Sequence, residues 1–311
     1  MSLRKCLILI VLAALALSAY AAWHFQLPRL AWHWAAMHLQ AEQRASDSVW
    51  LPYYRVSIEG QAIQGVDDAS GLTFNEDSGT LFSITNSTPQ RILELDTEGR
   101  LLRQIELSGA PDPEGITHVR GNIFAISDER EHSVFRVEIE ADTRHIDLSQ
   151  APRIELPPST RKNLSYEGIS WDANSHRLFV SQEKAPMRIF AITGFDDSFT
   201  RTEDELWITE WRPANLGGLF INDLSSLSFH EASGRMLLLS DESALIVEYS
   251  ADGHPVSLLP MWRGLHGLSR RVPQAEGLAV GRDGTLYVIS EPNLFYRFER
   301  SQPAPWASSN P

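Results

Sequence analysis

Three glutamates at equivalent positions of a repeated pattern are the residues of this chain best suited to chemistry. Glu114, Glu167 and Glu276 each precede a glycine and a short apolar run, in "PEGITHV", "YEGISWD" and "AEGLAVG". Two looser copies carry Ser70 and Ser225 at the same position, and the five positions follow one another at intervals of 44, 53, 58 and 51 residues. Carboxylates gathered in this way bind hard cations or take part in acid–base chemistry.

A second group of oxygen-bearing side chains lies at the end of the second apolar run in each copy. Asp68 and Asp223 add carboxylates two residues before Ser70 and Ser225, in the two copies where serine replaces glutamate. The residues of the second group are Asn86, Asp128, Glu129, Glu183, Asp241, Glu242 and Glu291.

The elements that position these residues are short strands. Each copy contains an apolar run, a turn rich in Gly, Asn or Asp, and two further runs, and the first four copies add a more variable fourth run. Four-stranded antiparallel units at this period are typical of β-propeller blades. We therefore expect an all-β propeller over residues 50–300, with five blades, or six as the alternative.

The two ends of the repeat region indicate how the ring closes. The fifth copy ends after its third run, and the segment "YYRVSIEG" before the first copy alternates like a strand at Tyr54, Val56 and Ile58. We expect this segment to become the outer strand of the last blade. Because the first two strands of a blade are antiparallel, both polar groups converge on one mouth of the central channel.

Glutamates that face one another in a narrow channel repel, so at least one would have a raised pKa and hold a proton. A bound cation relieves the repulsion. Carboxylates and hydroxyls without His or Cys favour Ca²⁺, and less readily Mg²⁺. We expect the ligands to be Glu114, Glu167, Glu276, Asp223 and Asp68, with the remaining residues on the rim. In the alternative, the glutamates bind backbone amides of neighbouring strands and only align the blades.

The N-terminus predicts a membrane anchor. Arg4 and Lys5 precede an uncharged run over residues 6–23, close to the length that crosses a bilayer. The length favours an uncleaved signal anchor over residues 1–28, and Ala19-Tyr20-Ala21 offers cleavage as the alternative. A helical or flexible linker would follow over 29–49, and a tail over 301–311. In either case the main body would be exported.

The amino-acid composition limits the kinds of partner and metal that the protein can bind. The formal net charge of −13 argues against nucleic acid, which requires clustered Lys and Arg. The single cysteine, Cys6, excludes an intrachain disulfide and a cysteine-based zinc site.

The segments "NDLSSLSF", "QAEGLAV" and "LYVISEPNLFYRF" resemble the SdiA-regulated family of bacterial proteins over residues 50–300. The resemblance implies an exported β-propeller related to NHL-repeat and phytase-like propellers, anchored in the bacterial inner membrane and facing the periplasm. It also implies a calcium-type cation near Glu114, Glu167 and Glu276. It implies no particular reaction.

Three functions remain open at this point. The first is a module that binds a small molecule, a peptide or an envelope protein over a cation at the mouth. The second is a metal-dependent hydrolase of phosphoesters or lactones at the same mouth, with His266 as the candidate general base. The third is a structural scaffold of the envelope. The absence of a recognisable catalytic set in the sequence favours the first.

Overall fold

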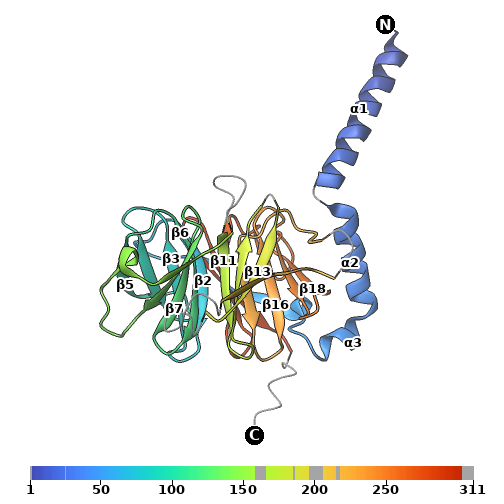
Figure 1. Ribbon diagram of the computed structural model, residues 1–311. Helices are drawn as coiled ribbons and strands as arrows, with labels where there is room; N and C mark the ends of the chain where they lie inside the picture. The colour runs from blue at the N-terminus through green and yellow to red at the C-terminus, as the bar shows by residue number, and fades with distance from the viewer. Residues whose placement is uncertain are drawn as a thin grey trace.

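The computed structural model describes residues 2–24, 26–157, 166–184, 186–195, 206–214 and 218–302 of the 311-residue chain. Five antiparallel sheets are arranged in a ring, and an N-terminal helix projects from one end of it (Figure 1). The expected five-bladed propeller is confirmed. The expected tail over 301–311 lies, beyond residue 302, outside the described residues.

Each blade begins at the central channel and proceeds outward, as the alternating runs of the sequence predict. Blade 1 consists of β2 (Ala69–Asn75), β3 (Thr80–Thr85), β4 (Arg91–Leu95) and β5 (Leu101–Ser108), and blade 2 of β6 (Pro113–Arg120), β7 (Ile123–Asp128), β8 (Ser133–Glu138) and β10 (Arg153–Glu155). Blade 3 consists of β11 (Tyr166–Asp172), β12 (Arg177–Gln182), β13 (Arg188–Thr193) and β14 (Trp207–Trp211), and blade 4 of β15 (Ser226–His230), β16 (Arg235–Ser240), β17 (Leu245–Tyr249) and β18 (Pro255–Pro260). Blade 5 consists of β19 (Ala275–Val280), β20 (Leu286–Ser290), β21 (Leu294–Arg300) and β1 (Tyr54–Ala62).

Blades 1 and 2 are joined by an exchange that the repeat pattern does not reveal. After β8 the chain crosses to blade 1, where β9 (His145–Asp147) pairs in parallel with β5. It then passes through a short 3₁₀ helix (Leu148–Gln150) and returns to pair β10 with β8. Blade 1 therefore carries a fifth, parallel strand that covers its outer edge.

The first strand of the chain closes the last blade, as expected. β1 pairs antiparallel with β21, with Tyr54 opposite Arg300 and Val56 opposite Phe298. The Tyr54 side chain is fully buried, and its hydroxyl donates to the Gly284 carbonyl at 2.7 Å.

The hydrophobic core consists of five clusters among the described residues, one between each pair of neighbouring blades. The cluster between blades 5 and 1 includes Leu72, Leu93 and Phe295, which shows that the ring is closed by packing as well as by pairing. Alternating side chains of each strand supply both faces of a blade to these clusters.

Inner strands of neighbouring blades are joined by hydroxyl groups. The Thr73 hydroxyl accepts the His118 amide at 3.1 Å, and the Thr117 hydroxyl accepts the Trp171 amide at 3.2 Å. Two more bonds of this kind follow around the ring, from the Phe229 amide to the Ser170 hydroxyl at 2.9 Å and from the Leu278 amide to the Ser226 hydroxyl at 3.2 Å.

Three helices precede the propeller. α1 (Leu3–His24) is apolar, and no other helix in the described residues is long and apolar enough to span a membrane. α2 (Leu27–Leu39) and α3 (Ala41–Ala45) lie against blade 4, with Met37 of α2 buried in the cluster between blades 3 and 4. A short 3₁₀ helix (Leu51–Tyr53) leads into β1.

Candidate functional site

The inner strands begin, and the second strands end, at the same end of the channel, which we call the acidic mouth. The pairing of Pro113 with Asp128 in blade 2 and of Ala275 with Ser290 in blade 5 fixes this arrangement. The register carries both polar groups of the sequence to one place because the strands are antiparallel neighbours.

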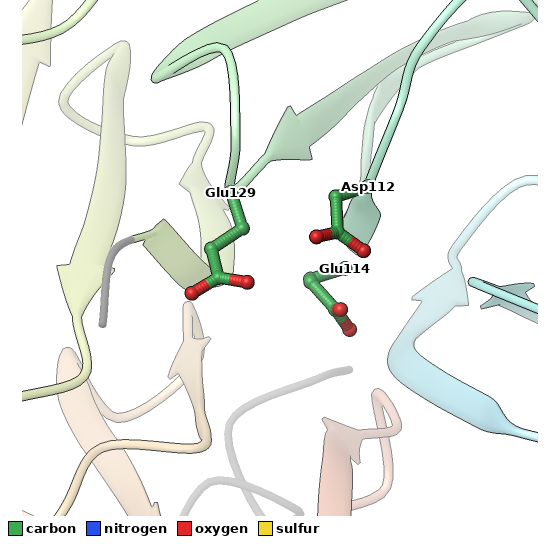
Figure 2. A group of neighbouring side chains, drawn as sticks. All are labelled: Asp112, Glu114 and Glu129. Atoms are coloured by element: carbon green, nitrogen blue, oxygen red, sulfur yellow. The ribbon is translucent and has the colours of Figure 1, made fainter. Parts of the chain in front are cut away.

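Three carboxylates of blade 2 form the tightest cluster at the acidic mouth. Asp112, Glu114 and Glu129 each offer an oxygen, and these three oxygens lie within 4.8 Å of one another. Figure 2 shows the three side chains directed toward a common space from the start of β6 and the loop after β7. Hard oxygen donors at this separation suit a cation such as Ca²⁺.

The cluster is held in place by neighbours on both sides. The Asn86 side-chain amide, from blade 1, donates to the Glu114 carboxylate at 2.8 Å. Arg130 lies 3.0 Å from the Asp112 carboxylate, and the Glu129 amide donates to the Asp112 carbonyl at 2.9 Å. The Glu114 and Asp112 carboxylates are therefore each held by a polar neighbour.

Electrostatic repulsion at the mouth is large. Burial, together with the smaller effect of the Asp112 and Glu129 charges, raises the pKa of Glu114 to about 7, against hydrogen bonds from Asn86 and Ser70 that lower it. Burial, with the charges of Glu291 and Asp241, raises the pKa of Glu276 to about 9.

Glu167 faces the other two glutamates across the channel. Burial raises its pKa well above the ordinary value, and the charges of Glu183, Glu276 and Glu114 add to this effect. The three glutamates of the repeated pattern therefore act on one another, and each binds a proton more readily than an ordinary glutamate unless a cation is present.

The family assignment rests on a match along most of the chain. A model of the SdiA-regulated family matches residues 46–299, which include all of the ring except the last residue of β21, and every residue of the acidic mouth described above. The chain belongs to the SdiA-regulated family.

Solved structures similar to this SdiA-regulated protein are distant in sequence. A streptogramin B lyase matches with a TM-score of 0.44 and 11% identity, over 81% of this chain and 99% of that one. A nidogen/laminin complex matches with a TM-score of 0.47 and 12% identity, over 76% of this chain and 84% of that one. A luciferin-regenerating enzyme matches with a TM-score of 0.47 and 11% identity, over 80% of this chain and 98% of that one.

Two of the expected mouth residues in this SdiA-regulated protein support loops. Buried Asp128 accepts the Asp112 amide at 2.8 Å and the Glu131 amide at 2.7 Å. Buried Asp223 accepts the Ser240 hydroxyl and the Glu242 amide, the latter at 3.2 Å. Burial, with the smaller effect of the Glu242 charge, raises the pKa of Asp223 to about 6. These hydrogen bonds and the Lys184 charge act in the opposite direction.

Blades 3 and 4 are linked at the rim by a lysine. Lys184 lies 2.6 Å from the Glu183 carboxylate and 2.9 Å from the Glu242 carboxylate. The Asp241 carboxylate accepts the Ala275 amide of blade 5 at 3.3 Å and lies 3.8 Å from Arg271.

The remaining rim residues are near blades 1 and 5. Gln274 donates to the Glu291 carboxylate at 2.9 Å, and burial, with the Asp68 charge, raises the pKa of Glu291. The Ser225 hydroxyl donates to the Ala275 carbonyl at 2.7 Å, and the Ser70 hydroxyl binds the Glu114 carboxylate. The structure thus brings all the sequence-derived mouth residues to one end of the channel.

His266 lies elsewhere. Its ring nitrogen Nδ1 is 2.9 Å from the Tyr54 carbonyl, and its own carbonyl accepts the Val56 amide at 2.8 Å. Tyr54 pairs with Arg300 at the end of β21, opposite the acidic mouth. The loop after β18 runs along the outside of blades 4 and 5, so His266 secures the closing strand instead of reaching the mouth.

Sequence reasoning missed Asp112, which completes the tightest cluster. It stands two residues before Glu114 in "DPEG", at the offset of Asp223 from Ser225 and of Asp68 from Ser70. That shared offset is the signal that could have identified it.

Proposed function

We propose that this SdiA-regulated protein is a membrane-anchored periplasmic propeller that binds Ca²⁺ at its acidic mouth and presents the ion to a ligand or partner. The ligands would be Asp112, Glu114 and Glu129, with Glu167 and Glu276 across the channel. The observation that carries the proposal is the cluster of three carboxylate oxygens within 4.8 Å, in which Glu114 has a pKa of about 7.

The alternative in which the glutamates only align the blades has less support. The inner-strand amides of His118, Trp171 and Phe229 are accepted by hydroxyl groups. Alignment is therefore achieved by serines and threonines, and the glutamate carboxylates face the channel opening. An arrangement that keeps repelling acids together, when other residues align the strands, is better explained by cation binding.

We do not extend the proposal to hydrolysis. The candidate general base, His266, is engaged with Tyr54 on the outer strand. Membrane attachment is supported by α1, and Arg4 and Lys5 before its apolar run favour a periplasmic propeller.

Calorimetric titration of the full-length protein in phospholipid nanodiscs with CaCl₂ tests the proposal. We expect saturable binding that Glu114→Gln weakens at least tenfold. Glu138→Gln, an exposed acid of the same blade paired with Arg136, is the matched control and should bind normally. Because a protonated Glu114 must lose its proton to bind the ion, binding at pH 7 should release protons, measured as a dependence of the heat on buffer ionisation enthalpy.

Two outcomes would overturn the proposal. One is an absence of saturable heat in the correctly folded wild-type protein. The other is equal affinity in the wild type and in Glu114→Gln, which would place any bound ion elsewhere.

A further inference from the structure

Helix α2 crosses blade 4 from the acidic mouth to the opposite end of the ring (Figure 1). Before its first turn, the Gln26 side chain donates to the Ile221 carbonyl at 3.2 Å, two residues before Asp223 of the mouth. Beyond its last turn, Arg44 donates to the Pro255 carbonyl at 3.1 Å. Pro255 pairs with Tyr249, where β17 ends far from the mouth. The helix therefore starts at the mouth end.

The direction of α2 determines which face of the ring meets the membrane. The Gln26 amide donates to the Trp23 carbonyl at 3.1 Å, which joins the start of α2 to the last turn of α1. α1 has 22 residues, none of them buried, and at 1.5 Å per residue it is about 33 Å long, enough to cross a bilayer. With α1 in the membrane, the acidic mouth faces the bilayer surface.

A pocket of about 240 Å³ opens at this end, between the first turns of α2 and the loop after β18. Its apolar walls include Leu27, Leu30, Phe220 and Trp262. Leu27 is 47% exposed and Trp262 is 38% exposed, so apolar surface borders the opening on the side from which α1 leaves. This volume is below the roughly 300–1,000 Å³ of most small-molecule sites, so it suits one end of a longer ligand.

The other end of the pocket is polar and belongs to the acidic mouth. Glu242 lines the pocket and also lies 2.9 Å from Lys184 on the rim. Arg271 lines it too, and donates to the Asp241 carbonyl at 2.7 Å. Among the described residues of the mouth, carboxylates outnumber the basic groups Lys184, Arg130 and Arg271, so the local charge favours a cationic group.

We propose that this pocket binds the apolar end of an amphiphile drawn from the bilayer, whose amine-bearing head lies over the acidic mouth beside Glu242. The position of the pocket at the base of α1 gives the chain access from the membrane. The inference rests on the membrane attachment and the acidic mouth of the proposed function. The amine would lie beside Glu242 of blade 4, at a different part of the mouth from the cluster of Asp112, Glu114 and Glu129 in blade 2.

The test uses the full-length protein in phosphatidylcholine nanodiscs that contain a lysophosphatidylethanolamine with a photoreactive group near the chain end. We expect cross-links to Leu27, Leu30 or Trp262. Leu27→Glu should lower the yield at least fivefold, because it places a charge at the apolar opening. Trp32→Glu is the matched control, since Trp32 lies on the same helix and is 71% exposed, and it should leave the yield unchanged.

A second comparison tests the head group. Lysophosphatidylglycerol with the same chain should cross-link less than the amine-bearing probe, and Glu242→Gln should remove that difference. Equal yields from both probes in the wild type would overturn the amine assignment. Equal yields in the wild type and Leu27→Glu would overturn the pocket.

Failure here can be distinguished from failure of the proposed function. Calcium titration of the same nanodiscs that shows binding without the cross-links would reject only the amphiphile. Release of the protein from membranes by alkaline carbonate would reject the anchor, and with it both proposals.

Discussion

Asn86 of blade 1 donates its side-chain amide across a blade boundary to the carboxylate of Glu114 in blade 2, over 2.8 Å. The bond joins two sheets at the acidic mouth, and it lowers the pKa that burial and the charges of Asp112 and Glu129 raise. One neutral amide thus lowers the pKa of an acid of the candidate cation site.

Replacing Asn86 by alanine should weaken calcium binding at pH 7. Without the donor, the pKa of Glu114 rises above about 7, so more of the carboxyl is protonated when the ion arrives. A charge-assisted hydrogen bond contributes about 1.5–3 kcal/mol, which corresponds to a loss of about tenfold or more in affinity. The loss should shrink at pH 9, where a larger share of Glu114 is ionised in the variant, and calorimetry at the two pH values measures it.

The control for this variant is Asn122→Ala, because Asn122 binds Glu140 at the opposite end of blade 2. Its affinity should equal that of the wild type. Undiminished affinity of Asn86→Ala at pH 7 would show that the amide does not tune Glu114.

The cation-free protein should lose stability as the pH rises from about 4.5 to about 9. The folded-state pKa values of Glu114 and Glu276 are about 7 and about 9, above the ordinary value of 4.5. Over this range the folded protein holds protons that the unfolded chain has lost, so raising the pH favours unfolding. Melting temperatures in the presence of a chelator measure the decline.

Glu276→Gln should flatten the part of this decline between pH 7 and pH 9, and added calcium should reduce the whole of it. A melting temperature that stays constant or increases across the range would contradict the assignment of raised pKa values to the mouth.

Gly115→Ala should destabilise the ring. A Cβ atom at this position would lie 2.2 Å from the Glu167 carbonyl of the next blade and 2.4 Å from the Ser127 hydroxyl. Backbone on one side and a buried side chain on the other leave little room for adjustment, so we expect a loss of about 1–3 kcal/mol in the free energy of unfolding. Urea denaturation measures it.

Gly281→Ala provides the comparison, because the nearest atom to a Cβ there is the Asp283 carboxylate at 3.1 Å, at the end of a side chain that can move. A loss in Gly115→Ala no larger than that in Gly281→Ala would refute the crowding of the inner strands.

Glu248→Ala should release the segment between α3 and β1. The buried Glu248 carboxylate accepts the Val49 amide at 2.8 Å, the Trp50 amide at 3.1 Å and the Ser257 hydroxyl. Its removal leaves these donors without an acceptor in the core, at a cost of about 3–5 kcal/mol. Limited proteolysis should then cut near residues 46–50. Glu248→Gln keeps one acceptor oxygen and should be intermediate; identical protection in all three proteins would contradict this role.

The ring and its acidic mouth could be predicted from the sequence because both depend on local patterns. The alternation at Tyr54, Val56 and Ile58 predicts a closing strand, which pairs with β21. Glu114, Glu167 and Glu276 lie together because they stand at the starts of the inner strands of one ring. The antiparallel arrangement of each hairpin then brings the end of the second strand to the same face.

The remaining features depend on contacts between distant segments. Gln26 lies in the segment expected to be the anchor, and Met37 lies in the expected helical or flexible linker. Their docking on blade 4 depends on the shape of a surface made more than 180 residues later. The loop that contains His266 follows the outside of blade 5 because its backbone pairs with Val56. No periodic pattern in the sequence indicates the docking of α2 on blade 4 or the contact of the His266 loop with Val56.

The pairing of β1 with β21 also determines when the ring can close during synthesis of the chain. The segment at residues 54–62 leaves the ribosome before any blade, yet its partner at residues 294–300 is made last. The nascent chain must therefore hold its terminal blade incomplete, with the edge of β1 unpaired, until synthesis is nearly finished. Only after the final residues emerge can the ring close, so a chain truncated before residue 294 has no route to the native ring and keeps an exposed strand edge that is prone to aggregation.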